Sequence, residues 1–382
     1  MQILTVDIGT GTQDVFLFDP ALDIENGFKL IMPSPTMIVH KRLRDATARG
    51  EAVLLTGVMM GGGPSQWAAR DHVRAGLTLY ATPGAARTFN DDLDYVQNEM
   101  GVHLIDDDEA DTLPDAVRIE LKDFDLPALA TAFATFGVTL TPDAIGVAVF
   151  DHGDSPPGYS DRQFRFDYLD QRIRALNRLS AFAYLSTNTP PIMTRLKAVA
   201  ASHSNGGAPL APLAPLVVMD TAPAAVLGAT FDPVTTACEQ VIICNVGNFH
   251  TLAFRMGPGG IEGVFEHHTG EIDQAKLDSL IDRLADGTLK HADVFDDMGH
   301  GALLYAAEPM PKPPSIVVTG PRRSLMRGSR HRPHFAVPFG DMMIAGCFGL
   351  LAAMADVLPD EEMREAIRDS LNGKAGKPPW EL

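Results

Sequence analysis

The chain has 382 residues, of which 45% are hydrophobic and 21% are charged, and its formal net charge is -18 with a pI near 5.0. This length accommodates two domains with separate cores, and the charged fraction is too low for a disordered acidic chain. The acidic balance argues against nucleic acid as the main partner, because binding a phosphate backbone needs a basic face.

The first residues carry no basic stretch followed by an apolar one, and no window approaches the unbroken apolar length of a membrane span. Three cysteines do not make a disulfide framework. We therefore predict a cytoplasmic protein with no secretory signal and no membrane partner.

The first half of the chain predicts alternating strands and helices. Strands are expected at 2–7, 14–19, 29–32, 52–58, 77–80, 102–105 and 144–150, and helices at 66–75, 91–100, 126–136 and 166–184. A strand-rich start followed by strand–helix alternation indicates a mixed α/β sheet.

The segment 203–215 is rich in Gly, Pro and Ala and is the predicted connection between two halves. It divides the chain into an N-terminal lobe with insertions, 1–215, and a C-terminal lobe, 216–382. After it, strands are expected at 216–220, 240–246, 250–256, 263–266 and 315–318, and helices at 221–228, 275–284 and 341–357. The strand–turn–strand pattern of the start recurs at 241–256, which suggests a duplicated two-lobed design. The apolar segment 342–354 packs either against its own lobe or against a second copy in a homodimer.

The most specific motif runs from residue 7 to residue 13 and reads Asp-Ile-Gly-Thr-Gly-Thr-Gln. It joins two predicted strands, and a turn rich in Gly and Thr exposes successive backbone N–H groups that can surround a phosphate. Gly9 and Gly11 permit backbone angles closed to other residues, and Asp7 at the strand end can hold a magnesium ion through water. The alternative is an ordinary hairpin with a glycine-rich turn. The predicted cofactor-binding residues are Gly9, Thr10, Gly11, Thr12 and Gln13.

This motif, with Val15 and Asp19, resembles the first phosphate loop of the actin, sugar kinase and heat-shock ATPase (ASKHA) superfamily. The resemblance implies an α/β fold of two ribonuclease H-like lobes with mixed sheets, and ATP and Mg²⁺ in a cleft between the lobes. It also implies a second phosphate hairpin, matched by 244–251, and an adenosine loop, matched by 317–321. The second hairpin has one glycine where kinases usually have a Gly-Thr-Gly run, and the adenosine loop has a proline where a second glycine is common. The implied cofactor-binding residues are Asn245, Gly247, Asn248, Gly320 and Pro321.

Asp220 ends a predicted strand and precedes a helix of small residues, 221–228. In the sugar kinases a similar Asp is the catalytic base, so the resemblance implies that Asp220 takes a proton from an acceptor hydroxyl. The alternative is that Asp220 caps the helix, with its carboxylate accepting from exposed N–H groups. One residue can do both. Asp7 is the other predicted catalytic residue, through its magnesium ion.

Histidines and carboxylates follow several strands. Asp151 and His152 come directly after the apolar run 144–150, and further groups lie at 266–271 and 297–301. Together they form a divalent metal or substrate site, or they are ordinary surface and core histidines. No pair has the tight His-Glu-x-x-His spacing. The predicted substrate residues are Asp151, His152, His267 and His268.

Four segments also resemble a family of uncharacterised proteins labelled as pyruvate formate-lyase activating. They are 7–14, 151–154, 265–270 and 319–323. An iron–sulfur enzyme of that kind holds its cluster with Cys-x-x-x-Cys-x-x-Cys. Cys238 and Cys244 are six residues apart and Cys347 is distant, so one chain does not supply the cluster.

The leading hypothesis is an ATP-dependent phosphotransferase similar to a small-molecule kinase, with Mg–ATP between the lobes and Asp220 activating an acceptor hydroxyl. One alternative is an ATPase that energises a partner redox enzyme, sharing a cluster between two subunits through Cys238 and Cys244. Another is a non-catalytic nucleotide- or metabolite-binding protein, which the degenerate second and third motifs favour. The sequence does not reveal the acceptor.

Overall fold

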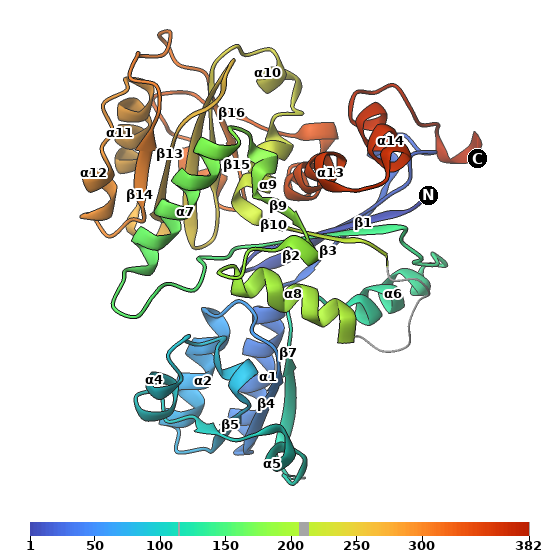
Figure 1. Ribbon diagram of the computed structural model, residues 1–382, viewed down its shortest axis with the longest axis vertical. Coiled ribbons are helices and arrows are strands. Elements are labelled where there is room, and N and C mark those ends of the chain that lie inside the picture. Colours follow the sequence, from blue (N-terminus) through green and yellow to red (C-terminus); the bar gives the residue numbers. More distant parts are fainter. Residues whose placement is uncertain (114, 206–213, 382) are drawn as a thin grey trace.

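The computed structural model describes residues 1–113, 115–205 and 214–381 (Figure 1). Of the predicted connection 203–215, residues 206–213 therefore lie outside the described residues. Three sheets organise the described part of the chain, two of six strands and one of four.

The first sheet has the strand order β3-β2-β1-β8-β10-β9. Its first three strands form an antiparallel meander, while β8 runs parallel to β1 and β10 runs parallel to β8. Every residue of β1, β8 and β10 is buried, as expected of central strands covered on both faces. The strands are β1 (Ile3–Ile8), β2 (Thr12–Phe18), β3 (Phe28–Pro33), β8 (Ala144–Val149), β9 (Ala183–Leu185) and β10 (Leu216–Asp220).

The second sheet, in the order β14-β13-β12-β11-β15-β16, repeats the first five strands of this topology from β13 to β16, while its sixth strand, β14, lies at the opposite edge from β9. Its meander is β11, β12 and β13, β15 runs parallel to β11, and β16 runs parallel to β15. If the five shared strands of each sheet are numbered along the chain, their order is 3-2-1-4-5, and only the second strand is antiparallel to the others. This is the order of a ribonuclease H-like lobe. Two such lobes make the predicted actin-like ATPase fold. The strands are β11 (Val241–Val246), β12 (His250–Gly257), β13 (Gly260–His268), β14 (Gly301–Leu304), β15 (Ile316–Thr319) and β16 (His334–Phe335).

The predicted lobe boundary after residue 215 needs correction. β10 begins at Leu216 and pairs with β8 in the first sheet, so the chain enters the second sheet only at β11. The Gly-, Pro- and Ala-rich composition of 203–215 marked a break in regular structure but not the division between lobes.

A third unit is inserted between β3 and β8 and lies at the bottom of Figure 1. Its four parallel strands, in the order β6-β5-β4-β7, have a hydrophobic core of their own. Its longest helix, α1, was not predicted, although Ser34 caps its start, Pro35 is its first residue and Gly50 ends it in the left-handed conformation. The elements are α1 (Pro35–Arg49), β4 (Val53–Gly57), α2 (Pro64–Arg74), β5 (Leu79–Ala81), α3 (Pro83–Ala86), α4 (Leu93–Asn98), β6 (His103–Leu104), α5 (Asp107–Asp111) and β7 (Val117–Leu121).

The remaining helices surround the two large sheets. The predicted helix 166–184 is shorter and begins earlier, because Ser160 caps its start and extended backbone at Leu176 ends it before β9. Neither α8 nor α14 was predicted. The helices are α6 (Leu126–Thr135), α7 (Asp161–Ala175), α8 (Thr194–Asn205), α9 (Thr221–Ala229), α10 (Pro233–Thr236), α11 (Gln274–Ala285), α12 (His291–Phe295), α13 (Ala345–Val357) and α14 (Glu361–Leu371).

Each of the helices α9 and α13 packs against the sheet of the lobe to which it does not belong in sequence. α9 follows the first sheet, yet its Val226 packs in one core with Ile243 of the second sheet. α13 follows the second sheet, yet its Phe348 packs with Phe16 of the first. The apolar segment 342–354 is thus covered largely within its own chain, where α13 is mostly buried.

Glycines make the contact between α9 and α13 close. A Cβ atom on Gly228 would lie 1.7 Å from the carbonyl oxygen of Ala345, and one on Gly349 would lie 1.8 Å from that of Ala224. No side chain fits at either distance, so the two helix backbones touch directly.

We predict that Gly228→Ala lowers the free energy of unfolding by at least about 2 kcal/mol, because the added methyl group separates the two helices. Alanine favours a helix more than glycine does, so a lower free energy of unfolding would come from the contact between α9 and α13 and not from helix propensity. Urea denaturation followed by circular dichroism measures this. Gly270→Ala, where a Cβ meets nothing within 4 Å, is the control, and equal stability of the two variants would contradict the prediction.

Candidate functional site

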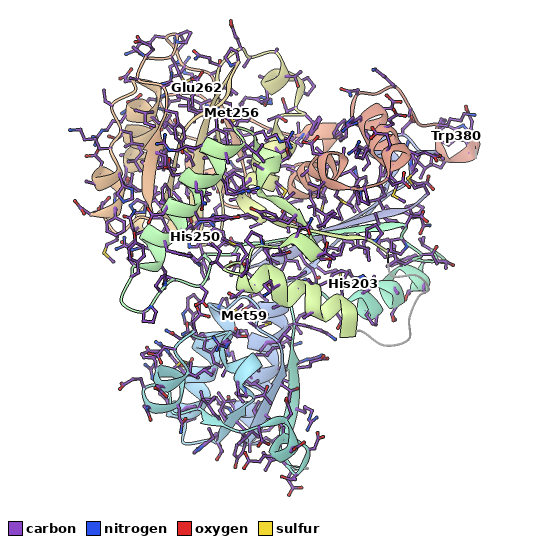
Figure 2. All side chains as sticks on the ribbon, in the orientation of Figure 1. Met59, His203, His250, Met256, Glu262 and Trp380 are labelled. Atoms are coloured by element: carbon purple, nitrogen blue, oxygen red, sulfur yellow. The ribbon has the colours of Figure 1, made fainter. Side chains whose placement is uncertain are left out.

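A cleft of about 500 Å³ lies where the two lobes and the inserted unit meet. This volume is in the range of small-molecule sites. Met59 at the top of the inserted unit and His250 at the lower edge of the second lobe both line it (Figure 2). The predicted residues that line it are Asp7, Gly9, Thr10, Thr12, Asp151, His152, Asn245, Gly247, Asn248, Gly320 and Pro321.

Two hairpins of matching geometry face this cleft, one from each lobe. In the first, between β1 and β2, the N–H group of Gly9 donates to the carbonyl of Thr12 at 2.9 Å. In the second, between β11 and β12, the N–H group of Gly247 donates to the carbonyl of His250 at 3.0 Å. The same hydrogen bond closes both turns, so the duplication extends from the sheets to the loops.

The tips of the two hairpins contact each other. A Cβ atom on Gly11 would lie 2.8 Å from Nδ2 of Asn248, so glycine lets the second hairpin approach the first. Gly11 and Gln13 are not among the described cleft-lining residues, and Gln13 instead donates its side-chain amide to the carbonyl of Pro33 at 3.0 Å.

The predicted adenosine loop lies against the second hairpin. Gly320 follows β15 with a φ of 97°, and a Cβ atom there would lie 2.4 Å from Oδ1 of Asn245. The N–H group of Arg322 donates to the carbonyl of Val246 at 3.0 Å. These contacts bring the loop and the hairpin to the same wall of the cleft.

Two buried carboxylates, Asp7 and Asp14, lie on the first-lobe side of the cleft. They are directly opposite each other in the register of β1 and β2, and both line the cleft. Burial raises the pKa of Asp7 to about 6, and burial together with the charge of Asp7 raises the pKa of Asp14 to about 8. Thr221 donates its hydroxyl to Asp7 at 2.5 Å.

This pair of carboxylates fits a hard divalent cation such as Mg²⁺, which takes oxygen ligands and keeps several waters. Oδ1 of Asp14 is buried and has no hydrogen-bond partner among the described residues. A cation would remove the repulsion between Asp7 and Asp14 and give that oxygen a partner.

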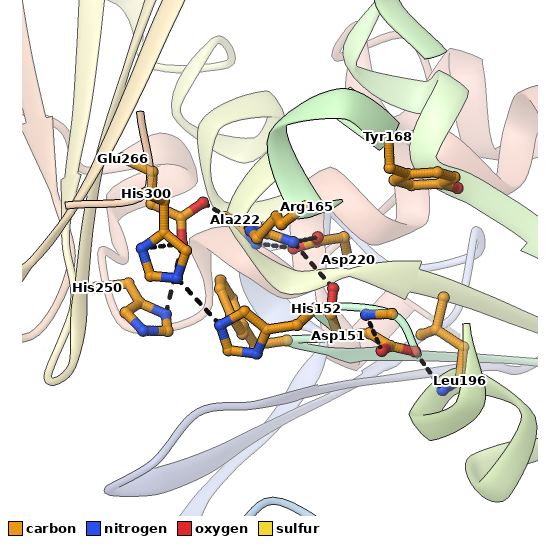
Figure 3. Close-up of polar contacts among 12 residues, drawn as sticks. Asp151, His152, Arg165, Tyr168, Leu196, Asp220, Ala222, His250, Glu266 and His300 are labelled. Atoms are coloured by element: carbon orange, nitrogen blue, oxygen red, sulfur yellow. Dashed lines mark hydrogen bonds and ion pairs between the residues drawn. The ribbon is translucent and has the colours of Figure 1, made fainter. Parts of the chain in front are cut away.

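Behind the cleft, Arg165 of α7 joins two buried acids (Figure 3). Its Nη1 donates to Asp220 and its Nε to Glu266, both at 2.7 Å. Asp220 also accepts from the N–H group of Ala222 at 3.1 Å, so it caps α9, and it is not among the described cleft-lining residues. Burial raises the pKa of Asp220, and the Arg165 guanidinium opposes that rise. No local motif signals Arg165, since its partners lie 55 and 101 residues away.

Asp151, one of the predicted substrate residues, is bound by two backbone N–H groups. The carboxylate accepts from the N–H groups of Gly153 at 2.9 Å and Leu196 at 3.0 Å, the second on α8. Burial raises its pKa. Asp151 thereby fixes the loop that carries His152.

Three histidines from separate segments gather at one end of the cleft. Each of His152, His250 and His300 offers a ring nitrogen, and these atoms lie within 4.8 Å of one another. The ring of His268 lies 4.7 Å from that of His300. Burial lowers the pKa of each of the three, that of His300 to about 2, so all are neutral at pH 7.

His267 does not join this group, although the sequence placed His267 and His268 in the same predicted site. Its Nε2 faces Asp297 at 3.4 Å. Adjacent residues of a strand point to opposite faces, so β13 cannot aim both side chains at one site. Alternation along the strand was the signal that would have separated them.

The three cysteines do not form a cluster site. Cys244 and Cys347 are buried, and burial raises the pKa of the Cys244 thiol to about 12. Cys238 is half-buried and donates to the carbonyl of Val234. All three cysteines are described, and none belongs to the metal-ligating group found among the described residues, so they do not form an iron–sulfur site within one chain.

The duplicated ribonuclease H-like lobes and the cleft between them are the arrangement of the actin-like ATPase fold. Residues 60–325 match the family described as "Putative pyruvate format-lyase activating enzyme (DUF1786)", and the chain belongs to this family. No curated protein sequence matches the chain.

Several solved structures are similar to the chain at low sequence identity. The activator of the 2-hydroxyisocaproyl-CoA dehydratase from Clostridium difficile with bound ADPNP is 9% identical, with a TM-score of 0.33 over 97% of this chain and 98% of that one. The ethanolamine utilization protein EutJ from Carboxydothermus hydrogenoformans is 11% identical, with a TM-score of 0.32 over 92% and 89%. The ROK hexokinase from Thermus thermophilus is 12% identical, with a TM-score of 0.29 over 92% and 96%.

None of the helices in the described part of the chain has the length and apolar content that crossing a bilayer requires.

We predict that Asp14→Asn raises the melting temperature by a few degrees at pH 8 and changes it little near pH 4. A carboxyl whose folded pKa is raised stabilises the fold below its unfolded pKa, and this contribution is lost as pH rises to the folded pKa of about 8. Millimolar Mg²⁺ should stabilise the wild type at pH 8 and not the variant.

Thermal unfolding between pH 4 and pH 8.5, with and without Mg²⁺, measures this. Asp45→Asn, an exposed change on α1, is the control. Parallel pH profiles of the wild type and Asp14→Asn would contradict the prediction.

Proposed function

We propose that this chain binds Mg–ATP in the cleft and transfers the terminal phosphoryl group to the hydroxyl of a small molecule. The observation that carries the proposal is the pair of facing hairpins, closed by the same hydrogen bond, beside the carboxylates of Asp7 and Asp14. Hairpin turns supply backbone donors for phosphate, and the carboxylates supply ligands for its cation.

Each wall of the cleft has a part in this proposal. Thr10 and Asn248 hold the phosphates from opposite lobes, and the adenosine lies against Gly320 and Pro321. Mg²⁺, bound at Asp7 and Asp14, neutralises charge on the transferred group. The acidic chain, with its net charge of -18, needs this cation because it offers no broad positive field.

The inserted unit forms the wall where we place the acceptor. Asp123, just after β7, pairs with Arg195 at 2.8 Å, and Arg195 also donates to the carbonyl of Phe150. Across the cleft, the ring of Trp67 lies 5.6 Å from that of Phe249 in the second hairpin. Movement of this unit would open the site to the acceptor and then exclude water from the phosphoryl group.

We assign Asp220 as the base that takes the acceptor proton. Burial raises its pKa, which favours proton uptake, and its neighbours Thr221 and Ala222 line the cleft. Its ion pair with Arg165 opposes this role.

That ion pair favours a second candidate, a protein that binds the nucleotide without turnover. A carboxylate that already accepts from a guanidinium and caps a helix is a poor base. The third hypothesis, an ATPase that energises a partner redox enzyme through a shared cluster, is weakened by the burial of Cys244.

We predict Mg²⁺-dependent ATP binding that Asp7→Ala weakens at least tenfold, because the variant loses a carboxylate facing the cation. Calorimetric titration of the purified protein with ATP, with and without Mg²⁺, measures it. Asp45→Asn should bind as the wild type does. Folded wild-type protein that gives no binding heat and no thermal shift with Mg–ATP would end the nucleotide proposal.

We predict that Asp220→Asn lowers ATP turnover about 100-fold or more while the Kd for ATP changes less than threefold. Asparagine still caps a helix, so the change chiefly removes the charge. Release of ADP in the presence of a hydroxyl-compound panel measures turnover. Turnover equal in the two proteins would remove Asp220 as base, and binding without any turnover in the wild type would favour the second candidate.

A further inference from the structure

The cluster of His152, His250 and His300 lies at one end of the same cleft, beside the second hairpin, and its ring nitrogens have no part in the nucleotide site proposed above. His152 follows β8 in the first lobe, His250 begins β12, and His300 directly precedes β14 in the second lobe. The Nε2 atoms of His152 and His300 are 3.1 Å apart. Two nitrogens bound tetrahedrally to Zn²⁺ lie about 3.3 Å apart, given Zn–N bonds of about 2.0 Å. The observed separation is therefore close to that of two ligands of one ion.

A buried acid stands behind two of these rings (Figure 3). Oε1 of Glu266 lies 3.6 Å from Nδ1 of His250 and 3.7 Å from Nδ1 of His300. Oε1 of Glu266 and Nδ1 of His300 are both buried and have no hydrogen-bond partner among the described residues. A metal on Nε2 of His300 would leave its Nδ1–H group directed at Glu266, the carboxylate–histidine–metal arrangement that orients ligands.

The surrounding residues hold this geometry and leave one side open. Arg162 donates to the carbonyls of Phe295 and Gly299, which fixes the segment before His300. His300 is buried, whereas His152 and His250 line the cleft. An ion at the three nitrogens would therefore have its open coordination position toward the cleft.

The ligand atoms indicate the class of cation. Glu266 is the acid that faces the rings of His250 and His300, and Arg165 pairs with Glu266 and with Asp220. Imidazole nitrogens offer lone pairs that select transition metals over Mg²⁺.

We propose that His152, His250 and His300 bind one divalent transition-metal ion of the Zn²⁺ class, whose open position takes water or an oxygen atom of the small-molecule substrate. Three protein ligands and one open position are the pattern of a catalytic metal site, not a structural one. The inference does not rest on ATP binding, because none of the three nitrogens belongs to the nucleotide site.

Metal content of the full-length protein, purified without an affinity tag, tests this proposal. After removal of metal with a chelator, we expect Zn²⁺ and Co²⁺ to bind at about one ion per chain, with Co²⁺ giving the visible absorption of a four-coordinate site. His300→Ala should weaken binding by more than the about 10- to 100-fold typical of a lost outer partner. His103→Ala, an exposed change on β6, should bind as the wild type does.

If His300→Ala does not fold, X-ray absorption on the Zn²⁺-loaded wild type still tests the proposal, because it identifies the atoms that bind the ion. We expect imidazole nitrogens at about 2.0 Å. Absence of Zn²⁺ and Co²⁺ binding, affinity unchanged in a folded His300→Ala protein, or a shell of oxygens alone would overturn the proposal. ATP titration of the metal-free protein reports separately on the nucleotide site.

Discussion

The direct contact between the backbones of α9 and α13 determines how the two lobes pack and where the cleft between them lies. Gly228 and Gly349 remove the side chains that would hold the helices apart, and each helix then covers the sheet of the other lobe. The same crossing forms part of the cleft surface, because Ala222 of α9 and Gly346 of α13 both line it. A Cβ atom on Gly346 would lie 1.8 Å from Oδ2 of Asp7, so the helix start can approach the carboxylate only as glycine.

This crossing also explains the electrostatics of the first-lobe wall. Helix packing keeps Asp7 and Asp14 out of water, and the register of β1 and β2 sets them side by side. Two like charges in that position destabilise the fold unless a proton or a cation intervenes. The raised pKa of Asp14, caused by burial and then by the charge of Asp7, expresses this cost, whereas burial and the charge of Asp220 raise the pKa of Asp7. A cation at these two carboxylates, as proposed above, would remove this cost.

The sequence predicted those parts of the molecule whose determinants are local. Residues 9–11 form the turn between β1 and β2, and the Gly- and Thr-rich composition of 7–12 alone indicated a hairpin there. The strand ends at Asp151 and Asp220 could be found in the same way. Duplication was visible too, because 241–256 repeats the first hairpin.

Long-range determinants escaped prediction for a physical reason. Arg165 meets its acids only after three segments fold together, and nothing in its own helix marks it as buried. The histidine cluster likewise takes His152 from the first lobe and His300 from the second. Composition misplaced the lobe boundary, since pairing of β10 with β8 depends on strand order and not on the residues before Leu216.

Arg165 links the two proposals, because one guanidinium serves both Asp220 and Glu266. A dication at the histidines would draw the charge of Glu266 toward itself and leave Arg165 more strongly paired with Asp220. Stronger pairing would lower the pKa of Asp220 and make it a weaker base. By thermodynamic linkage, protonation of Asp220 would then weaken metal binding to the same extent. The buried Arg165 would thus couple the metal site to proton transfer with no movement of either lobe.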